Sequence, residues 1–127
     1  MDLNELSYQI RKAAFKVHKI LGPGLLEIVY EKALVYELTK MGIYAERQVG
    51  VPTTYETLEF DTGFMADVIV ENRIIVEVKS VEYIIPRFRQ ILLTYLKLSN
   101  KKLGFIFNFN CERLVDKVSI IRMVNGL

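Results

Sequence analysis

The chain has 127 residues, 51% of them apolar, and its 17 basic and 15 acidic residues leave a net charge of only +2. A charge this small neither requires nor excludes a polyanionic partner. The single cysteine excludes an internal disulfide, and with the single histidine it leaves no ligand set for a Cys/His zinc site. The length predicts one domain over residues 1–127.

The apolar residues are spread through the chain. No run approaches the length that crosses a membrane, and the first residues, MDLNELSYQIRKAAF, lack the pattern of a signal peptide. We therefore expect a soluble protein of the reducing cytoplasm, without a membrane partner.

The first third of the chain predicts two helices. Apolar side chains recur at helical spacing over residues 2–21, and the GPG segment at 22–24 ends this first helix. A second helix is predicted from residue 25 to residue 41, closed by Gly42.

The rest of the chain predicts six strands around a third helix. The strands are IYAERQV (43–49), TTYETLEF (53–60), FMADVIV (64–70), RIIVEVK (73–79), LGFIFNF (103–109) and KVSIIRMV (117–124). Gly50 and Pro52 separate the first two, and DTG at 61–63 predicts the next turn. The third helix runs from Pro86 to about Leu98.

This order of elements predicts an α/β (α+β) fold, with a mixed central sheet flanked by helices. The third helix connects the strand ending at Lys79 to the strand beginning at Leu103. Such a crossover makes these two strands parallel, and we expect it to be right-handed.

Charged residues interrupt the strongly apolar strands at Asp67, Glu77 and Lys79. Because alternate residues of a strand share a face, Glu77 and Lys79 point the same way, and a salt bridge between them is one interpretation. Glu27 begins a helical stripe that continues through Tyr30, Leu34, Leu38 and Met41. It therefore faces inward or toward a cleft, unless it is simply a first-turn glutamate favoured by the helix dipole.

Glu27, Asp67 and Glu77 together offer three inward-leaning carboxylates beside one lysine. Clustered carboxylates raise each other's pKa, and a divalent cation with oxygen ligands, Mg²⁺ or Mn²⁺, relieves this repulsion. Such a metal can activate a water and stabilise a phosphoryl transition state. Lys79 can orient that water or neutralise the developing charge.

Asp67 and Glu77 must share a face of the sheet if they are to share a metal. This requires the pairs 68–76, 69–75 and 70–74. Glu71, Asn72 and Arg73 then form a three-residue loop, with a left-handed residue at Asn72 or Arg73. A two-residue turn would send the two carboxylates to opposite faces and leave Glu77 and Lys79 as a salt bridge.

Three segments resemble a known family. GLLEIVY (24–30) fits G-x-x-E-x-x-Y, and LGPGLLEIVYEKAL resembles the signature of the GxxExxY protein family. ADVIVENRIIVEVKS (66–80) and TYLKLSNKKLGFIFNFN resemble its second and third blocks. That family is grouped with the PD-(D/E)XK nuclease-like superfamily. The resemblance implies a restriction-endonuclease-like core and a Mg²⁺- or Mn²⁺-dependent nuclease that hydrolyses phosphodiester bonds of DNA or RNA.

The same resemblance assigns roles to the charged residues. Asp67 and Glu77 match the metal-binding acids, and Lys79 matches the lysine that positions or activates the attacking water. Glu27 matches a helical glutamate that contributes to the metal site, directly or through a water.

One position departs from this pattern. Related nucleases often carry a glutamine on the helix after E-x-K, whereas this chain has Ile91 there, with Gln90 one residue earlier. The alternative function is therefore a catalytically inactive nuclease-like module that binds nucleic acid or protein. In either case the partner would be selected by loops, by a second copy in a homodimer, or by another protein.

Overall fold

The computed structural model describes residues 1–127 as three helices and a five-stranded sheet. The helices are α1 (Leu3–Leu21), α2 (Glu27–Lys40) and α3 (Pro86–Ser99). The strands are β1 (Ala45–Tyr55), β2 (Leu58–Val70), β3 (Ile74–Lys79), β4 (Leu103–Asn108) and β5 (Ile120–Val124). None of the helices has the length and apolar character needed to cross a membrane.

The strands lie in the sheet in chain order, from β1 at one edge to β5 at the other. Strands β3 and β4 pair in parallel, and every other neighbouring pair is antiparallel. The parallel pair is the one that α3 connects, so the predicted mixed sheet flanked by helices is confirmed.

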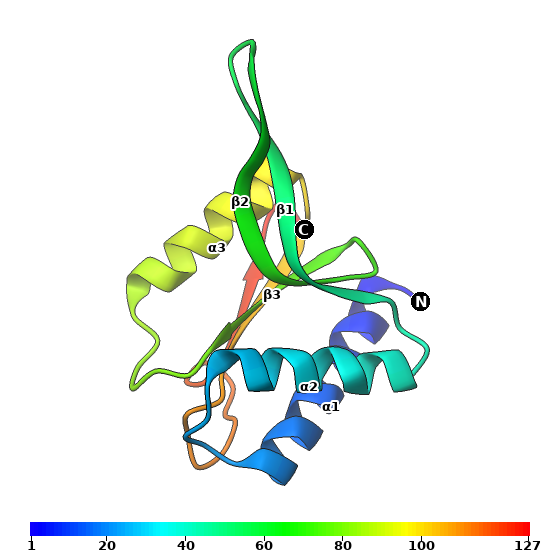
Figure 1. Cartoon of the computed structure of the whole chain (residues 1–127), viewed down its shortest axis with the longest axis vertical. Coiled ribbons are helices and arrows are strands. Elements are labelled where there is room, and N and C mark those ends of the chain that lie inside the picture. Colours follow the sequence, from blue (N-terminus) through cyan, green and yellow to red (C-terminus); the bar gives the residue numbers. More distant parts are fainter.

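Two apolar cores occupy the two faces of this sheet. Helices α1 and α2 cover one face and α3 covers the other (Figure 1). Ile10 of α1 and Leu34 of α2 pack with Phe107 on one face. Leu92 of α3 packs with Ile106 on the other face. The alternation of residues along β4 thus supplies both cores, which explains why every residue of that strand is buried.

Local signals set the ends of the helices. The side chain of Asp2 caps α1 by accepting a hydrogen bond from Glu5 N at 2.8 Å, and Gly22, with φ 67°, ends the helix. Pro86 lies in the first turn of α3, and Asn100 ends that helix in the left-handed conformation. All three predicted helices are confirmed to within two residues at each end.

The prediction of three strands between residues 43 and 70 is wrong, because the chain forms only β1 and β2 there. Strand β1 continues through Gly50 and Pro52, and the chain reverses at Glu56 and Thr57, where Glu56 has φ 54°. Pro52 is tolerated because β1 lies at the edge of the sheet and the register shifts between Val51 and Thr53.

The DTG segment at 61–63 lies inside β2 instead of forming the predicted turn. Its glycine serves a close approach between strands, since a Cβ at Gly63 would collide with Thr53 Oγ1. A glycine that reads as a turn signal in the sequence therefore allows two strands to pack tightly.

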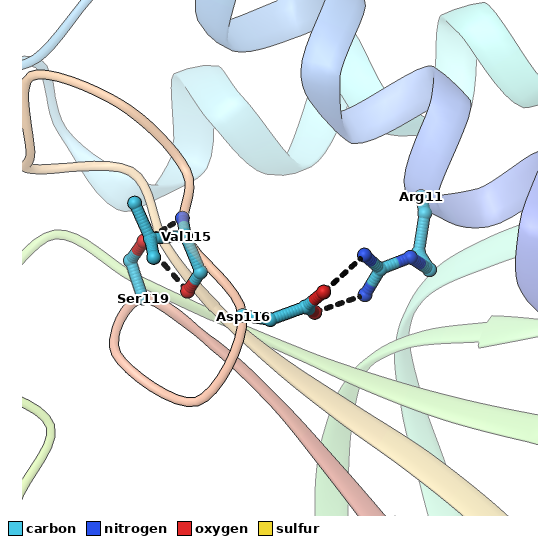
Figure 2. A network of polar contacts seen from close by, with 4 residues as sticks. All are labelled: Arg11, Val115, Asp116 and Ser119. Atoms are coloured by element: carbon cyan, nitrogen blue, oxygen red, sulfur yellow. Dashed lines mark hydrogen bonds and ion pairs between the residues drawn. The ribbon is translucent and has the colours of Figure 1, made fainter.

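The last strand also begins later than predicted, at Ile120 and not at residue 117. The preceding residues form a tight loop, in which Ser119 Oγ accepts a hydrogen bond from Val115 N at 2.7 Å (Figure 2). Asp116 in this loop accepts two hydrogen bonds from the Arg11 guanidinium, at 2.7 and 3.0 Å. This two-bond contact between Arg11 and Asp116 joins the loop to α1. A strand prediction that uses only the apolar pattern of residues 117–124 does not include such a contact.

Candidate active site

The hairpin between β2 and β3 has the register that a shared carboxylate site requires. Val68, Ile69 and Val70 pair with Val76, Ile75 and Ile74. The loop therefore contains three residues, and Glu71 and Asn72 are its left-handed positions, with φ 51° and 54°. The predicted pairing and the left-handed Asn72 are confirmed, and the second left-handed residue is Glu71 and not Arg73.

One step beyond these pairs, the carboxylates of Asp67 and Glu77 enter the space between the two strands. Asp67 N donates a hydrogen bond to Glu77 Oε2 at 2.9 Å, and Val78 N donates to Asp67 Oδ2 at the same distance. Each carboxylate is thus oriented by a backbone amide through one oxygen. The other oxygen of each carboxylate receives no backbone hydrogen bond.

The turn before α2 aims Glu27 toward this hairpin. Gly24 has φ +96°, a conformation that side-chain-bearing residues rarely adopt. The fully buried Tyr30 donates a hydrogen bond to Gly22 O at 2.6 Å and accepts one from Leu25 N at 3.1 Å. Tyr30 thus fixes the turn that contains Gly24 and leads directly into Glu27 at the start of α2.

Glu27 is joined to the end of β3. Its Oε2 accepts a hydrogen bond from Ser80 N at 3.0 Å, and Ser80 Oγ donates to Leu25 O at 2.7 Å. Glu27 is exposed, so it lies at the mouth of the site, whereas Glu77, only 8% exposed, lies at its floor.

Lys79 shares the face of Glu77 but makes no ion pair with it. The four ion pairs of the chain join other residues. Its Nζ lies 4.4 Å from the centroid of the Phe88 ring on α3. This cation–π contact holds the ammonium beside the two carboxylates without neutralising them.

Burial and mutual repulsion dominate the electrostatics of the carboxylates. Burial, then the charge of Asp67, raises the pKa of Glu77 to about 8. The pKa of Asp67 is also raised, chiefly by burial and in part by the charge of Glu27. Lys79 and the backbone hydrogen bonds act in the opposite direction on both groups but do not restore their ordinary pKa values. The single lysine beside the two carboxylates therefore does not offset their burial and mutual repulsion.

Residues 4–123 match the family model described as the PD-(D/E)XK nuclease superfamily. The chain belongs to the PD-(D/E)XK nuclease superfamily. No curated protein and no solved structure matches the chain. Membership supports a nuclease-like function with a nucleic-acid substrate, and members of the superfamily generally use divalent metals such as Mg²⁺. Membership of the narrower GxxExxY family stays a prediction.

Two residues that were not predicted from the sequence, Glu31 and Gln48, lie beside the carboxylates expected from the superfamily pattern. Glu31, only 4% exposed, lies one turn after Glu27 on α2, and burial is the main cause of its raised pKa. Gln48 Nε2 donates to Glu31 Oε1 at 2.9 Å and reaches Asp67 Oδ1 at 3.5 Å. The four-residue spacing from Glu27 was a signal for Glu31. No sequence pattern marked Gln48, whose φ is 50°.

A third missed residue is Asn108, at the end of β4 and 4% exposed. Its Oδ1 accepts a hydrogen bond from Val81 N at 3.1 Å, and its Nδ2 donates to Val81 O at 2.9 Å. Phe109 N also donates to Lys79 O at 2.9 Å. These contacts fix the backbone that follows Lys79, so Asn108 positions the end of β3 from outside the site.

The helix after E-x-K supplies no amide to the carboxylates. Ile91, expected at the glutamine position, is 38% exposed, and Gln90 is exposed and makes no hydrogen bond. Both line a shallow hollow on α3 together with Thr94 and Tyr95. The amide near Asp67 comes from Gln48 on β1 instead.

The chemistry of the donors suits a hard divalent cation, since Asp67 and Glu77 are adjacent carboxylates that form no ion pair. No three His, Cys, Asp or Glu side chains converge closely enough to enclose one cation. The chain thus offers a pair of protein ligands, with Glu27 at the mouth, and the remaining coordination positions of a metal would be taken by water or substrate.

Proposed function

We propose that the chain is a divalent-metal-dependent nuclease that hydrolyses phosphodiester bonds of DNA or RNA. The observation that carries the proposal is the pair of adjacent carboxylates, Asp67 and Glu77, which are oriented by backbone amides and form no ion pair. Removing charge from water without a partner is costly, so a cation bound between the two carboxylates would stabilise them.

Asp67 and Glu77 would hold Mg²⁺ or Mn²⁺ through the oxygens that accept no backbone hydrogen bond. When bound, the metal activates water and stabilises the charge of a phosphoryl transition state. The amides of Asp67 and Val78 orient these ligands, as outer hydrogen bonds do in metal sites generally. Glu27 would contribute at the mouth of the site, directly or through a water.

Lys79 would act on the attacking water and the scissile phosphate. Its ammonium is held by the Phe88 ring and lacks an acidic partner, so its hydrogen-bond donors remain available to anionic oxygen. Residues 1–127 would form one nuclease-like domain that binds its nucleic acid in the cytoplasm.

The experiment is a calorimetric titration with Mn²⁺ followed by cleavage assays on plasmid and single-stranded DNA and RNA. We expect binding and cleavage for the native chain, and loss of both in Asp67→Asn and Glu77→Gln. Glu112→Gln, an exposed position outside the site, is the matched control and should retain both activities. Cleavage that survives in both site variants would overturn the proposal.

One observation favours the alternative of an inactive module. Ile91 occupies the expected glutamine position, and no residue of α3 supplies an amide to the carboxylates. The same experiment separates the two functions, because an inactive module that binds nucleic acid or protein would neither bind Mn²⁺ nor cleave nucleic acid.

A further inference from the structure

The tip of the β1–β2 hairpin, residues 54–63, forms an arm that stands clear of the rest of the molecule (Figure 1). Every residue of the arm is exposed. Strand β2 pairs with β3 only at its last three residues, so the arm has no neighbour in the sheet beyond its own two strands. An isolated two-stranded ribbon is marginally stable in water, which makes this arm a candidate contact surface.

The base of the arm is firmly placed, although its tip is free. Phe64, which follows the arm in β2, stacks on Tyr95 of α3 with ring centroids 3.9 Å apart. The arm is therefore presented at a fixed position with respect to the body of the protein.

The chemistry of the arm favours a protein partner over a nucleic acid. Tyr55, Leu58 and Phe60 are between 46% and 68% exposed. The arm also carries three carboxylates, at Glu56, Glu59 and Asp61, and no Lys or Arg occurs between Gln48 and Asn72. A phosphate backbone requires cations, so the arm repels it. Exposed apolar groups rimmed by one sign of charge suit a surface with apolar groups and the opposite charge.

Such a surface exists on the same chain, between α1 and α2. A hollow of about 280 Å³ is lined by Lys12, Ala13, Lys16, Glu37, Lys40 and Met41. Glu37 binds Lys16 at 2.9 Å and Lys40 at 3.2 Å, whereas Lys12 has no ion pair. The hollow thus combines an apolar floor with an excess of positive charge.

We propose that the arm of one copy docks into this basic hollow of a second copy. The arm and the α1–α2 pair lie toward opposite ends of the molecule in Figure 1, so the arm cannot reach the hollow of its own chain. An antiparallel two-fold pair brings each arm beside the other copy's hollow, and the assembly closes as a dimer. Pairing arm to arm would instead bring like charges together.

The experiment is a charge exchange, read out as molecular mass by light scattering over roughly 1–100 μM protein, the range of weak protein contacts. The native chain should form dimers. Glu59→Lys and Lys12→Glu should each weaken association by about tenfold or more, because each places like charges at the contact. The double variant carries both changes on every copy and should restore the dimer.

The matched controls are Lys19→Glu, on the same helix but outside the hollow, and Glu112→Lys, outside the arm. Both should leave the mass unchanged, and thermal melts should show that all variants are folded. Phe60→Ser should weaken the dimer without changing its charge.

Several outcomes would overturn the proposal. A native chain that stays monomeric, an open-ended assembly, or a dimer indifferent to Glu59→Lys and Lys12→Glu would each do so. A monomer in which Lys12→Glu weakens nucleic-acid binding would assign the hollow to phosphates instead. The measured masses do not depend on nuclease activity, because the arm and the hollow lie outside the proposed active site.

Discussion

Glu77 couples the stability of the chain to pH. Its pKa is about 8 in the folded protein, against an ordinary value of 4.5, because burial and Asp67 disfavour its charge. Below pH 4.5 the Glu77 carboxyl is protonated in both the folded and the unfolded chain, so its burial costs no stability through ionisation. As pH rises toward 8, the unfolded chain releases the proton more readily than the folded one, so stability falls.

The first prediction is therefore that the metal-free protein loses on the order of a few kcal/mol of unfolding free energy between about pH 5 and pH 8. Urea titrations across this range measure the change. The raised pKa of Asp67 acts in the same direction. Glu37 and Asp116 act oppositely, since lysine and arginine lower their pKa values, but their effect lies below pH 4.5.

Glu77→Gln is the control for this prediction, because an amide of the same shape cannot ionise. Most of the decline above pH 5 should disappear in this variant. An equal decline in native and variant proteins would assign the pH dependence to another group.

Lys79 carries the second prediction. Lys79→Ala should preserve Mn²⁺ binding and abolish cleavage, because the ammonium acts on water and phosphate and not on the cation. The loss of the Phe88 contact should cost only about 0.5–1 kcal/mol of unfolding free energy. Calorimetry, single-turnover cleavage and a thermal melt check the three parts, and cleavage at the native rate would remove Lys79 from the mechanism.

At the scale of elements, the β2–β3 hairpin was predictable because chemistry and geometry constrained it together. Asp67 and Glu77 can lie on the same face of the sheet only if the loop between their strands has an odd number of residues. The structure has such a loop, of three residues. The turn between β1 and β2 was not predictable in this way. Pro52 and the DTG segment read as breaks, yet edge placement and the close approach at Gly63 accommodate both within strands.

The site was predictable only where its residues interrupt an apolar pattern. Asp67, Glu77 and Lys79 stand out in buried strands, and Glu27 stands out at the end of an apolar stripe. Gln48 did not stand out, because a polar residue in a polar edge strand carries no such contrast. The contacts of Gln48 depend on how β1 packs against α2. The spacing of residues within a single element carries no information about that packing.

The third prediction concerns the junction between β3 and β4. Asn108→Ala removes both hydrogen bonds to Val81 and should cost about 1–3 kcal/mol of unfolding free energy. Because the backbone after Lys79 then loses its anchor, cleavage should fall by more than substrate binding does. Measuring kcat and KM separately tests this positioning role.

Asn125→Ala is the matched control for this prediction. Asn125 Nδ2 donates to Leu96 O and Lys101 O, far along α3 from the carboxylates. A similar loss of stability with unchanged kcat is expected there. If both variants lower kcat equally, Asn108 is structural only.

At the scale of the whole molecule, charge is divided between regions. The net charge of the chain is +2, yet residues 49–72 contain no Lys or Arg and include Asp67 together with the three carboxylates of the arm. Positive charge is therefore concentrated on the helices and the C-terminal third. A nucleic-acid substrate would approach the site from those basic regions, leaving the acidic arm to proteins.

The fourth prediction joins the site to the stability of the entire fold. Mg²⁺ or Mn²⁺ should raise the melting temperature at pH 8, because a cation bound by Asp67 and Glu77 offsets their repulsion and binds only the folded chain. The Asp67→Asn, Glu77→Gln double variant should be at least as stable as the native chain without metal, since it lacks the buried charges, and should gain little from metal. Melting curves of both proteins with Mn²⁺ and with a chelator decide the matter. An equal gain in the two proteins would place the metal at other residues, and the buried pair would then need a different cationic partner.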